Sequence, residues 1–166
     1  MNGNFLMKAM SKLFVVTALL VAMGANGQNI PKWKAADLDT AITNAKGPTI
    51  INFWASFCKP CMEELPYFQQ LVREHQSAGL QLVLVNLDLR ETYPKLDGFA
   101  RKLKITAPIK FLDETNADLF CPVVDSSWSG AIPASLFINN KKGYRKFFED
   151  QLSEKALEKE IKALIE

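Results

Sequence analysis

The spacing of apolar residues changes along the chain from a helical period to an extended one and back. Residues 35–46 place apolar side chains three or four positions apart, which predicts a helix that a Gly-Pro pair ends. Residues 49–54 are mostly apolar, which is typical of a buried strand. Residues 60–76 return to helical spacing with Pro66 inside, where the proline removes a backbone donor and is expected to kink the helix.

The second half of the chain continues this alternation. Residues 81–87 are rich in leucine and valine and predict a central strand, and residues 96–103 predict a helix behind it. We also expect a strand at 109–112, a short helix at 116–120, a strand hairpin at 135–138 and 144–148, and a final helix that Ser153 caps. Alternating strands and helices predict an α/β fold, and the length suits a single domain.

The first 27 residues have the layout of a secretory signal peptide. Lys8 and Lys12 precede an uncharged apolar stretch at 13–23, and small residues follow. The stretch is shorter than the roughly 20 residues that a membrane-spanning helix needs, which favours cleavage over anchoring. We expect cleavage after Gly27 and a mature domain of residues 28–166 outside the cytoplasm.

The charge of this mature domain is balanced. Removing the two lysines of the leader leaves 18 of the 20 basic residues, which match the 18 acidic ones. A neutral domain without a basic cluster gives no reason to expect nucleic acid or an anionic membrane as a partner. We expect protein partners and a monomer.

Two cysteines lie where the strand at 49–54 gives way to the next helix. Cys58 stands at the expected start of that helix, where unpaired N–H groups and the helix dipole favour a thiolate. Cys61 follows about one turn later, close enough to form a disulfide with Cys58. The pair predicts a dithiol redox site in which Cys58 attacks and Cys61 resolves.

Other uses of the cysteines are less well supported. A zinc site would need further ligands, and His75 lies about 21 Å along the helix from Cys61, so we expect neither a metal nor a cofactor beyond the disulfide. The third cysteine, Cys121, precedes a proline at the expected end of a short helix. A lone cysteine without an activating neighbour is more often a buried apolar residue than a reactive one.

The order of these elements resembles the thioredoxin superfamily over residues 35–166. A strand, the motif W-A-x-x-C-x-P-C, a helix with an internal proline, a central strand, an I-P pair before a hairpin and a closing helix follow in that order. The resemblance implies a thioredoxin fold, with a central mixed β-sheet flanked by helices. It also implies that the Ile132-Pro133 bond is cis and faces the disulfide.

Three features are similar to the exported TlpA/ResA-like reductases. Asn52 stands where thioredoxin has a buried aspartate, and Glu64 completes the pattern C-x-x-C-x-x-E-x-P. The 44 residues between Asp88 and Pro133 leave room for the inserted helix and strand of that branch.

The same resemblance suggests further site residues, each with a simpler structural alternative. Trp54 and Phe57 could be core aromatics, and we expect Trp54 to be half core and half rim of a substrate-binding site. Trp128 is a weaker candidate for that rim, whereas the edge at Ile132 and Pro133 is expected to hold the substrate backbone. Lys59 and Glu64 could be solvated surface residues, or they could tune the dithiol and relay a proton.

The leading functional hypothesis is a reductase of protein disulfides outside the cytoplasm. The family resemblance implies a membrane thiol carrier as its electron donor. Lys59-Pro60 between the cysteines lacks the histidine of strongly oxidising exported relatives, which favours a reductant. A disulfide oxidase or isomerase, and a thioredoxin-like binding module without turnover, remain alternatives; a peroxidase fits the C-x-x-C motif less well.

Overall fold

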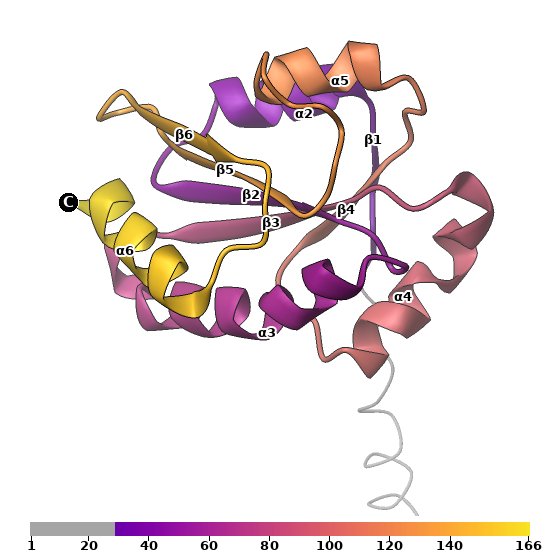
Figure 1. The fold of residues 1–166 in the computed structure, drawn as a ribbon, viewed down its shortest axis with the longest axis horizontal. Coiled ribbons are helices and arrows are strands. Elements are labelled where there is room, and N and C mark those ends of the chain that lie inside the picture. Colours follow the sequence, from indigo (N-terminus) through magenta and orange to yellow (C-terminus); the bar gives the residue numbers. More distant parts are fainter. Residues whose placement is uncertain (1–28) are drawn as a thin grey trace, which may run out of the picture.

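The computed structural model describes residues 29–166, which form one six-stranded mixed sheet flanked by helices (Figure 1). The strands are β1 (Lys32–Trp33), β2 (Thr49–Trp54), β3 (Gln81–Asn86), β4 (Ile109–Leu112), β5 (Ala134–Asn139) and β6 (Tyr144–Phe148). The helices are α2 (Ala35–Thr43), α3 (Lys59–Glu74), α4 (Tyr93–Lys102), α5 (Ala117–Val124) and α6 (Glu154–Ile165), with 3-10 turns at Gln76–Ala78 and Arg90–Thr92. The expected leader and its cleavage after Gly27 lie outside the described residues.

The sheet has the order β1-β4-β3-β2-β5-β6. The first four strands in this order are parallel, and β5 and β6 run antiparallel to their neighbours. The predicted α/β fold with a mixed sheet is therefore confirmed. Within residues 29–166, no helix is both long enough and apolar enough to cross a membrane.

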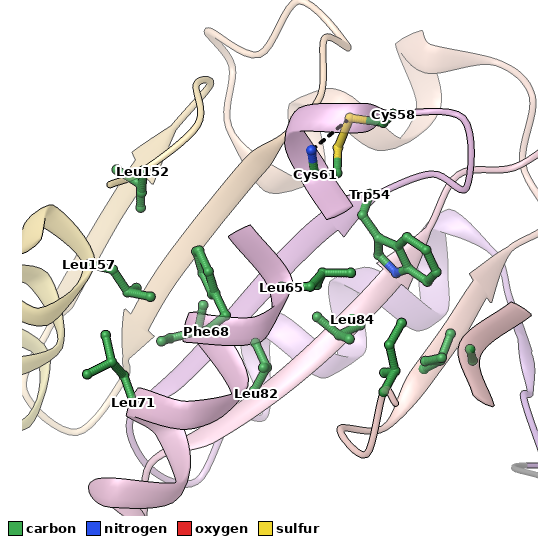
Figure 2. Packing of buried hydrophobic residues seen from close by; sticks show 14 of the residues in the cluster. Trp54, Cys58, Cys61, Leu65, Phe68, Leu71, Leu82, Leu84, Leu152 and Leu157 are labelled. Carbon is green, nitrogen blue, oxygen red and sulfur yellow. Dashed lines mark hydrogen bonds between the residues drawn. A yellow bond between two sulfur atoms is a disulfide. The ribbon is translucent and has the colours of Figure 1, made fainter. Parts of the chain in front are cut away.

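Two apolar clusters fill the space on either side of the sheet. One packs α3, α4 and α6 against one face, and Figure 2 shows part of it, with Leu65 and Phe68 of α3 near Leu84 of β3. The other packs α2 and α5 against the opposite face. Because both faces are covered, every residue of the central strand β2 is buried, which explains why apolar residues predominate in it.

The buried strand β2 directly precedes the turn that carries the dithiol. Asn52 and Trp54 share the α3 face of the sheet, since side chains two positions apart on a strand point to the same side. The chain then turns and enters α3, which has Pro66 inside it as predicted.

Several element boundaries differ from the sequence prediction. The helix expected at 35–46 ends earlier, at Thr43. The prediction was too long because Ala45 continues the apolar spacing beyond the end of the helix. The helix expected at 96–103 begins earlier, at Tyr93. The prediction missed this first turn because Pro94 and Lys95 are exposed and extend no apolar spacing. The short strand β1 was not predicted, since two residues carry no readable period.

The helix α5 is longer than expected and passes through Pro122 to Val124. The proline removes one helical hydrogen bond, but Val124 is fully buried on the α2 side of the sheet, and this packing outweighs the lost bond. Between Asp88 and Pro133 the chain therefore holds α4, β4 and α5, in the place where the resemblance implied an inserted helix and strand.

Candidate active site

Cys58 and Cys61 form a disulfide at the amino-terminal end of α3 (Figure 2), with 5.3 Å between their Cα atoms. Cys58 is the N-cap of the helix, and its Sγ accepts the N–H of Cys61 at 3.3 Å. The local sequence favours this arrangement, because Pro60 falls in the first turn, where a helix needs no backbone donor. The backbone N–H of Cys58 also donates to Ala55 O at 3.1 Å, which closes the turn after β2.

The two sulfurs differ in access. Cys58 keeps 7 % of its surface exposed and Cys61 keeps none, so the outer sulfur is the one that an incoming disulfide can reach. Lys59 points into solvent, with its side chain 84 % exposed, and lies 3.7 Å from Glu63 in an i,i+4 ion pair. A charge so exposed is strongly screened, so a tuning role for Lys59 would be small.

Glu64 is buried beneath the dithiol turn, so its interpretation as a surface carboxylate was wrong. Asn52 Nδ2 donates to Glu64 Oε1 at 2.7 Å and to Ser135 Oγ at 3.0 Å, and the N–H of Leu152 donates to Glu64 Oε2 at 3.2 Å. Burial raises the pKa of Glu64 to about 7 and outweighs the opposing effect of the bonds from Asn52 and Leu152. The carboxyl therefore titrates near neutral pH, one helical turn after Cys61.

The tryptophans do not form a rim. Trp54 has no exposed surface and stacks on Phe99 of α4, with ring centroids 6.3 Å apart, so its expected share in a substrate-binding rim was wrong. Trp128 is also buried and packs on Phe53 at a centroid distance of 4.5 Å. Phe57, by contrast, is 71 % exposed and is not a core aromatic.

The Ile132-Pro133 bond is cis, as predicted. Pro133 is buried and Ile132 is half-buried. Within residues 29–166, the backbone N–H and C=O of Ile132 have no hydrogen-bond partner, which leaves this edge open.

A groove of about 360 Å³ joins this loop to the dithiol turn. Phe57, which precedes Cys58, lines it together with Ile132 of the cis-proline loop, and apolar side chains form much of the rest. Asp88 holds the dithiol turn in place at this side of the groove, because its carboxylate accepts the N–H of Ser56 at 2.7 Å. The remaining lining residues are Leu87, Leu89, Arg90, Phe111, Leu112, Glu114, Thr115, Phe120, Gly130 and Ala131.

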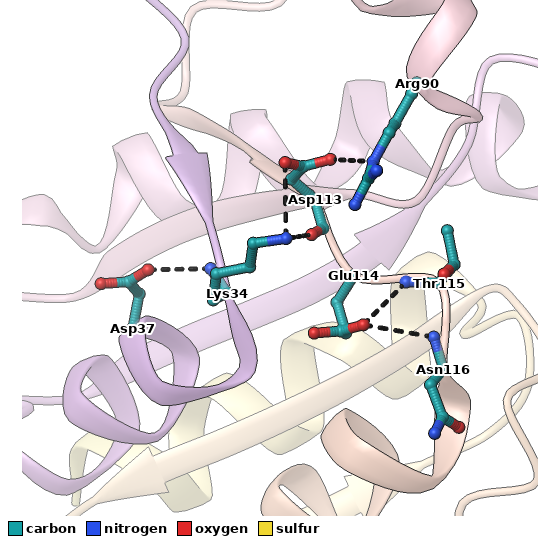
Figure 3. Close-up of polar contacts among 7 residues, drawn as sticks. All are labelled: Lys34, Asp37, Arg90, Asp113, Glu114, Thr115 and Asn116. Atoms are coloured by element: carbon teal, nitrogen blue, oxygen red, sulfur yellow. Dashed lines mark hydrogen bonds and ion pairs between the residues drawn. The ribbon is translucent and has the colours of Figure 1, made fainter.

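The end of the groove near β4 is fixed by polar contacts (Figure 3). Asp113 forms ion pairs with Arg90 and Lys34, which lowers the pKa of its carboxyl. The next residue, Glu114, accepts the backbone N–H of Thr115 at 3.1 Å and turns the chain toward α5. Charged residues that are distant in sequence from the cysteines therefore stabilise this end of the groove.

The remaining candidates lie apart from the dithiol. Cys121 is buried in α5, as expected of an apolar cysteine, and desolvation together with the charges of Glu149 and Asp118 raises the pKa of its thiol. His75 caps the carboxyl-terminal end of α3, at the other end of the helix from Cys58. In the part of the chain that the structure describes, no three metal-ligating side chains come together.

Sequence reasoning missed the groove and the residues that shape it. Asp88 directly follows a predicted central strand, a position from which a polar side chain commonly reaches a site, so a signal for it was present. Glu149 follows the last strand and reaches the cis-proline loop, and no local pattern reveals that contact.

The mixed sheet, the dithiol at a helix start and the cis-proline loop together define a protein of the thioredoxin superfamily. Residues 26–144 match the model of the AhpC/TSA family, and the chain belongs to this family.

Similar proteins carry the name thiol-disulfide oxidoreductase. Sporulation thiol-disulfide oxidoreductase A of Bacillus subtilis (strain 168) is 39 % identical over 72 residues, which are 43 % of this chain and 44 % of that protein. Thiol-disulfide oxidoreductase ResA of Geobacillus thermodenitrificans is 24 % identical over 144 residues, which are 84 % of this chain and 78 % of that protein. The chain thus spans less than half the length of the first relative and most of the second.

Solved structures agree on the fold. The crystal structure of StoA from Bacillus subtilis superimposes with a TM-score of 0.53 and 30 % identity, covering 70 % of this chain and 84 % of that one. A thioredoxin-related protein from Neisseria meningitidis serogroup B gives a TM-score of 0.60 at 23 % identity, over 72 % of this chain and 85 % of that one.

Proposed function

We propose that the chain is a thiol-disulfide oxidoreductase that reduces disulfides of protein clients. The observation that carries the proposal is the Cys58–Cys61 disulfide at the start of α3. Cys58 keeps some exposed surface and directly follows the groove residue Phe57, whereas Cys61 keeps none. An exposed attacking sulfur and an enclosed resolving sulfur are the two parts that disulfide exchange requires.

The reaction transfers two electrons from the dithiol to the client. The Cys58 thiolate attacks one sulfur of the client disulfide, a mixed disulfide forms, and the client's other sulfur leaves as a thiolate that takes up a proton. Cys61 then loses its proton and attacks Cys58 Sγ, which releases the second client sulfur as a thiol and leaves the Cys58–Cys61 disulfide. A carboxyl whose pKa is about 7 is suited to accept the Cys61 proton, which supports Glu64 as the relay.

The client is proposed to bind as an extended segment. The unpaired N–H and C=O of Ile132 can pair with its backbone, as in strand addition to a sheet edge. The apolar lining of the groove beside Phe57 would receive a client side chain next to the target cysteine. The buried Pro133 supports this edge from inside the protein. Trp54, which is fully buried, acts only by packing within the core.

The cellular setting is part of the proposal. The leader pattern at residues 1–27 supports an extracytoplasmic location, where disulfides persist. Oxidised enzyme there needs an external reductant, and we propose a membrane thiol carrier. We also propose a monomer that meets its partners through the groove, and the balanced charge of the mature domain supports proteins over nucleic acid as those partners.

Trapping tests the proposed reaction. In a Cys61→Ser variant the mixed disulfide cannot be resolved, so a client should remain attached to Cys58 and be identified by mass spectrometry. The matched control is the double variant Cys58→Ser/Cys61→Ser, which should trap nothing. Equal capture by the two variants would contradict disulfide exchange and favour a binding module.

The direction of electron flow is tested by the reduction potential of the Cys58–Cys61 pair. A reductase should lie nearer to the roughly −270 mV of thioredoxin than to the roughly −120 mV of the oxidant DsbA. A value near the second figure would make the protein a net oxidase, because each 30 mV corresponds to about 1.4 kcal/mol.

A further inference from the structure

Glu149 connects the end of β6 to the loop that precedes the cis-proline. Its Oε1 accepts the backbone N–H of Ser129 at 3.0 Å and that of Ala131 at 3.1 Å. The Ser129 hydroxyl donates to the same oxygen, and Oε2 accepts the Ser129 N–H at 3.2 Å. These bonds lower the pKa of Glu149, so the side chain is a carboxylate at neutral pH.

The loop held in this way also contains a glycine in an unusual conformation and a hydrogen bond from Trp128. Gly130, between the two residues bound by Glu149, has a φ of +93°, a conformation that residues with a Cβ rarely adopt. The carbonyl of Ala131 accepts Trp128 Nε1 at 2.8 Å, so both backbone groups of Ala131 are occupied within the protein. The backbone groups of the next residue, Ile132, have no partner within residues 29–166.

The residues that follow Glu149 are fastened to the dithiol helix. Gln151 Nε2 donates to Pro60 O at 3.3 Å, and the N–H of Leu152 donates to Glu64 Oε2 at 3.2 Å. Tyr67 OH also donates to the carbonyl of Leu152. Residues 149–152, which lead from β6 to α6 in Figure 1, therefore join the cis-proline loop to α3.

We propose that Glu149 is a positioning residue for client reduction. It holds the open edge of Ile132 at a fixed place relative to Cys58, so that a client segment paired with Ile132 presents its disulfide to Cys58 Sγ. This inference rests on the proposed function, and it concerns clients that bind through their backbone. A small disulfide has no segment to pair and depends on the Cys58–Cys61 dithiol alone.

The test compares a disulfide-containing protein with a small aromatic disulfide as substrates of the full domain. We expect Glu149→Ala to lower the ratio of kcat/KM for the protein disulfide to kcat/KM for the small one about tenfold, since it removes bonds to a charged acceptor. Glu149→Gln keeps one carbonyl acceptor and should lower the ratio only about threefold. The matched control is Glu158→Ala, which removes an exposed carboxylate of α6 that pairs with Lys162.

Amide hydrogen exchange gives a readout that does not depend on turnover. The N–H groups of Ser129 and Ala131 should exchange faster in Glu149→Ala than in the wild type, while those of β2 should not. If Glu149→Ala does not fold, Glu149→Gln carries both measurements.

The outcomes separate this inference from the proposed function. A wild-type protein that reduces neither substrate defeats the proposed function itself. A wild type that reduces both, together with an unchanged ratio in the Glu149 variants, overturns the positioning role alone. Equal loss with both substrates also overturns it, because that result indicates general destabilisation of the site.

Discussion

Cys58 and Cys121 are buried to nearly the same extent, with 7 % and 5 % of their surfaces exposed. Their surroundings nevertheless have opposite effects on the stability of a thiolate. Cys58 caps a helix, where the dipole and free N–H groups stabilise a thiolate. Cys121 lies inside α5, where desolvation and the carboxylates of Glu149 and Asp118 raise the pKa of the thiol. Burial alone therefore does not identify a reactive cysteine; the local field does.

The two cysteines also differ in what covers them. Cys58 adjoins the groove that Phe57 lines. The cis-proline loop lies over Cys121, and a Cβ placed on Gly130 would stand 3.7 Å from its Sγ. A client disulfide can thus approach the first sulfur but not the second.

The largest difference between the two cysteines should appear in turnover. We expect Cys58→Ser to reduce client turnover to the uncatalysed rate, because the nucleophile is lost. Cys121→Ser should retain the wild-type rate within about twofold, since that thiol is neither activated nor accessible. Insulin reduction by the two variants measures the contrast, and a comparable loss in both would bring Cys121 into the mechanism.

Thiol titration sharpens the comparison. The pKa of Cys58 in the reduced protein should lie below the roughly 8.5 of a free thiol, and that of Cys121 should lie above it. Alkylation at a series of pH values, with each cysteine quantified by mass spectrometry, gives both midpoints. The comparison fails if the order of the two midpoints is reversed.

The buried carboxyl of Glu64, near the dithiol, should make the stability of the protein depend on pH. The pKa of Glu64 is raised from 4.5 to about 7, so the folded state holds this proton more tightly than the unfolded chain. The free energy of unfolding should therefore fall by about 3 kcal/mol as pH rises from 4.5 to 7, and stay lower above that range.

Glu64→Gln removes this titration. The amide can accept from Leu152 N–H. Once the Asn52 amide turns over, it can also donate to Asn52 Oδ1, which lacks a partner in the described part of the chain. Urea denaturation at pH 5 and pH 8 should show similar stabilities at pH 5 and a more stable variant at pH 8. Parallel pH curves for the two proteins would mean that Glu64 ionises in its ordinary range.

The smallest effect is expected at Lys59. Replacing this exposed residue with alanine removes a screened charge beside Cys58 and should raise the Cys58 pKa by only a few tenths of a unit. The alkylation series above measures this shift. A shift of a full unit would show that the lysine, and not the helix start, sets the difference between the two cysteines.

Local patterns were sufficient for much of this site. The cysteine pair follows a motif of a few residues, and the central strands follow mostly apolar segments. The cis Ile132-Pro133 bond was predicted from the resemblance to the thioredoxin superfamily. The burial of Glu64 was also within reach, because it shares a helical face with Cys61 and Phe68, both fully buried.

Contacts between distant segments were not accessible from the sequence. Trp54 stacks on Phe99, which lies more than forty residues later in the chain. Glu149 reaches Ser129 across the turn from β6 to the cis-proline loop. Such pairings depend on how the elements pack, and the spacing within one element carries no information about them.

The Cys58–Cys61 bond closes a loop of only a few residues. Cross-linking so short a loop restricts the unfolded chain by about 2 kcal/mol, compared with about 3 kcal/mol for a loop of fifteen residues. Opening the bond therefore releases little chain entropy. The two cysteines are only two members of one large apolar core, and the core on the other face of the sheet does not include them. The protein can exchange electrons in every cycle without refolding, and the balance between its two redox states is left to the charges around the sulfurs.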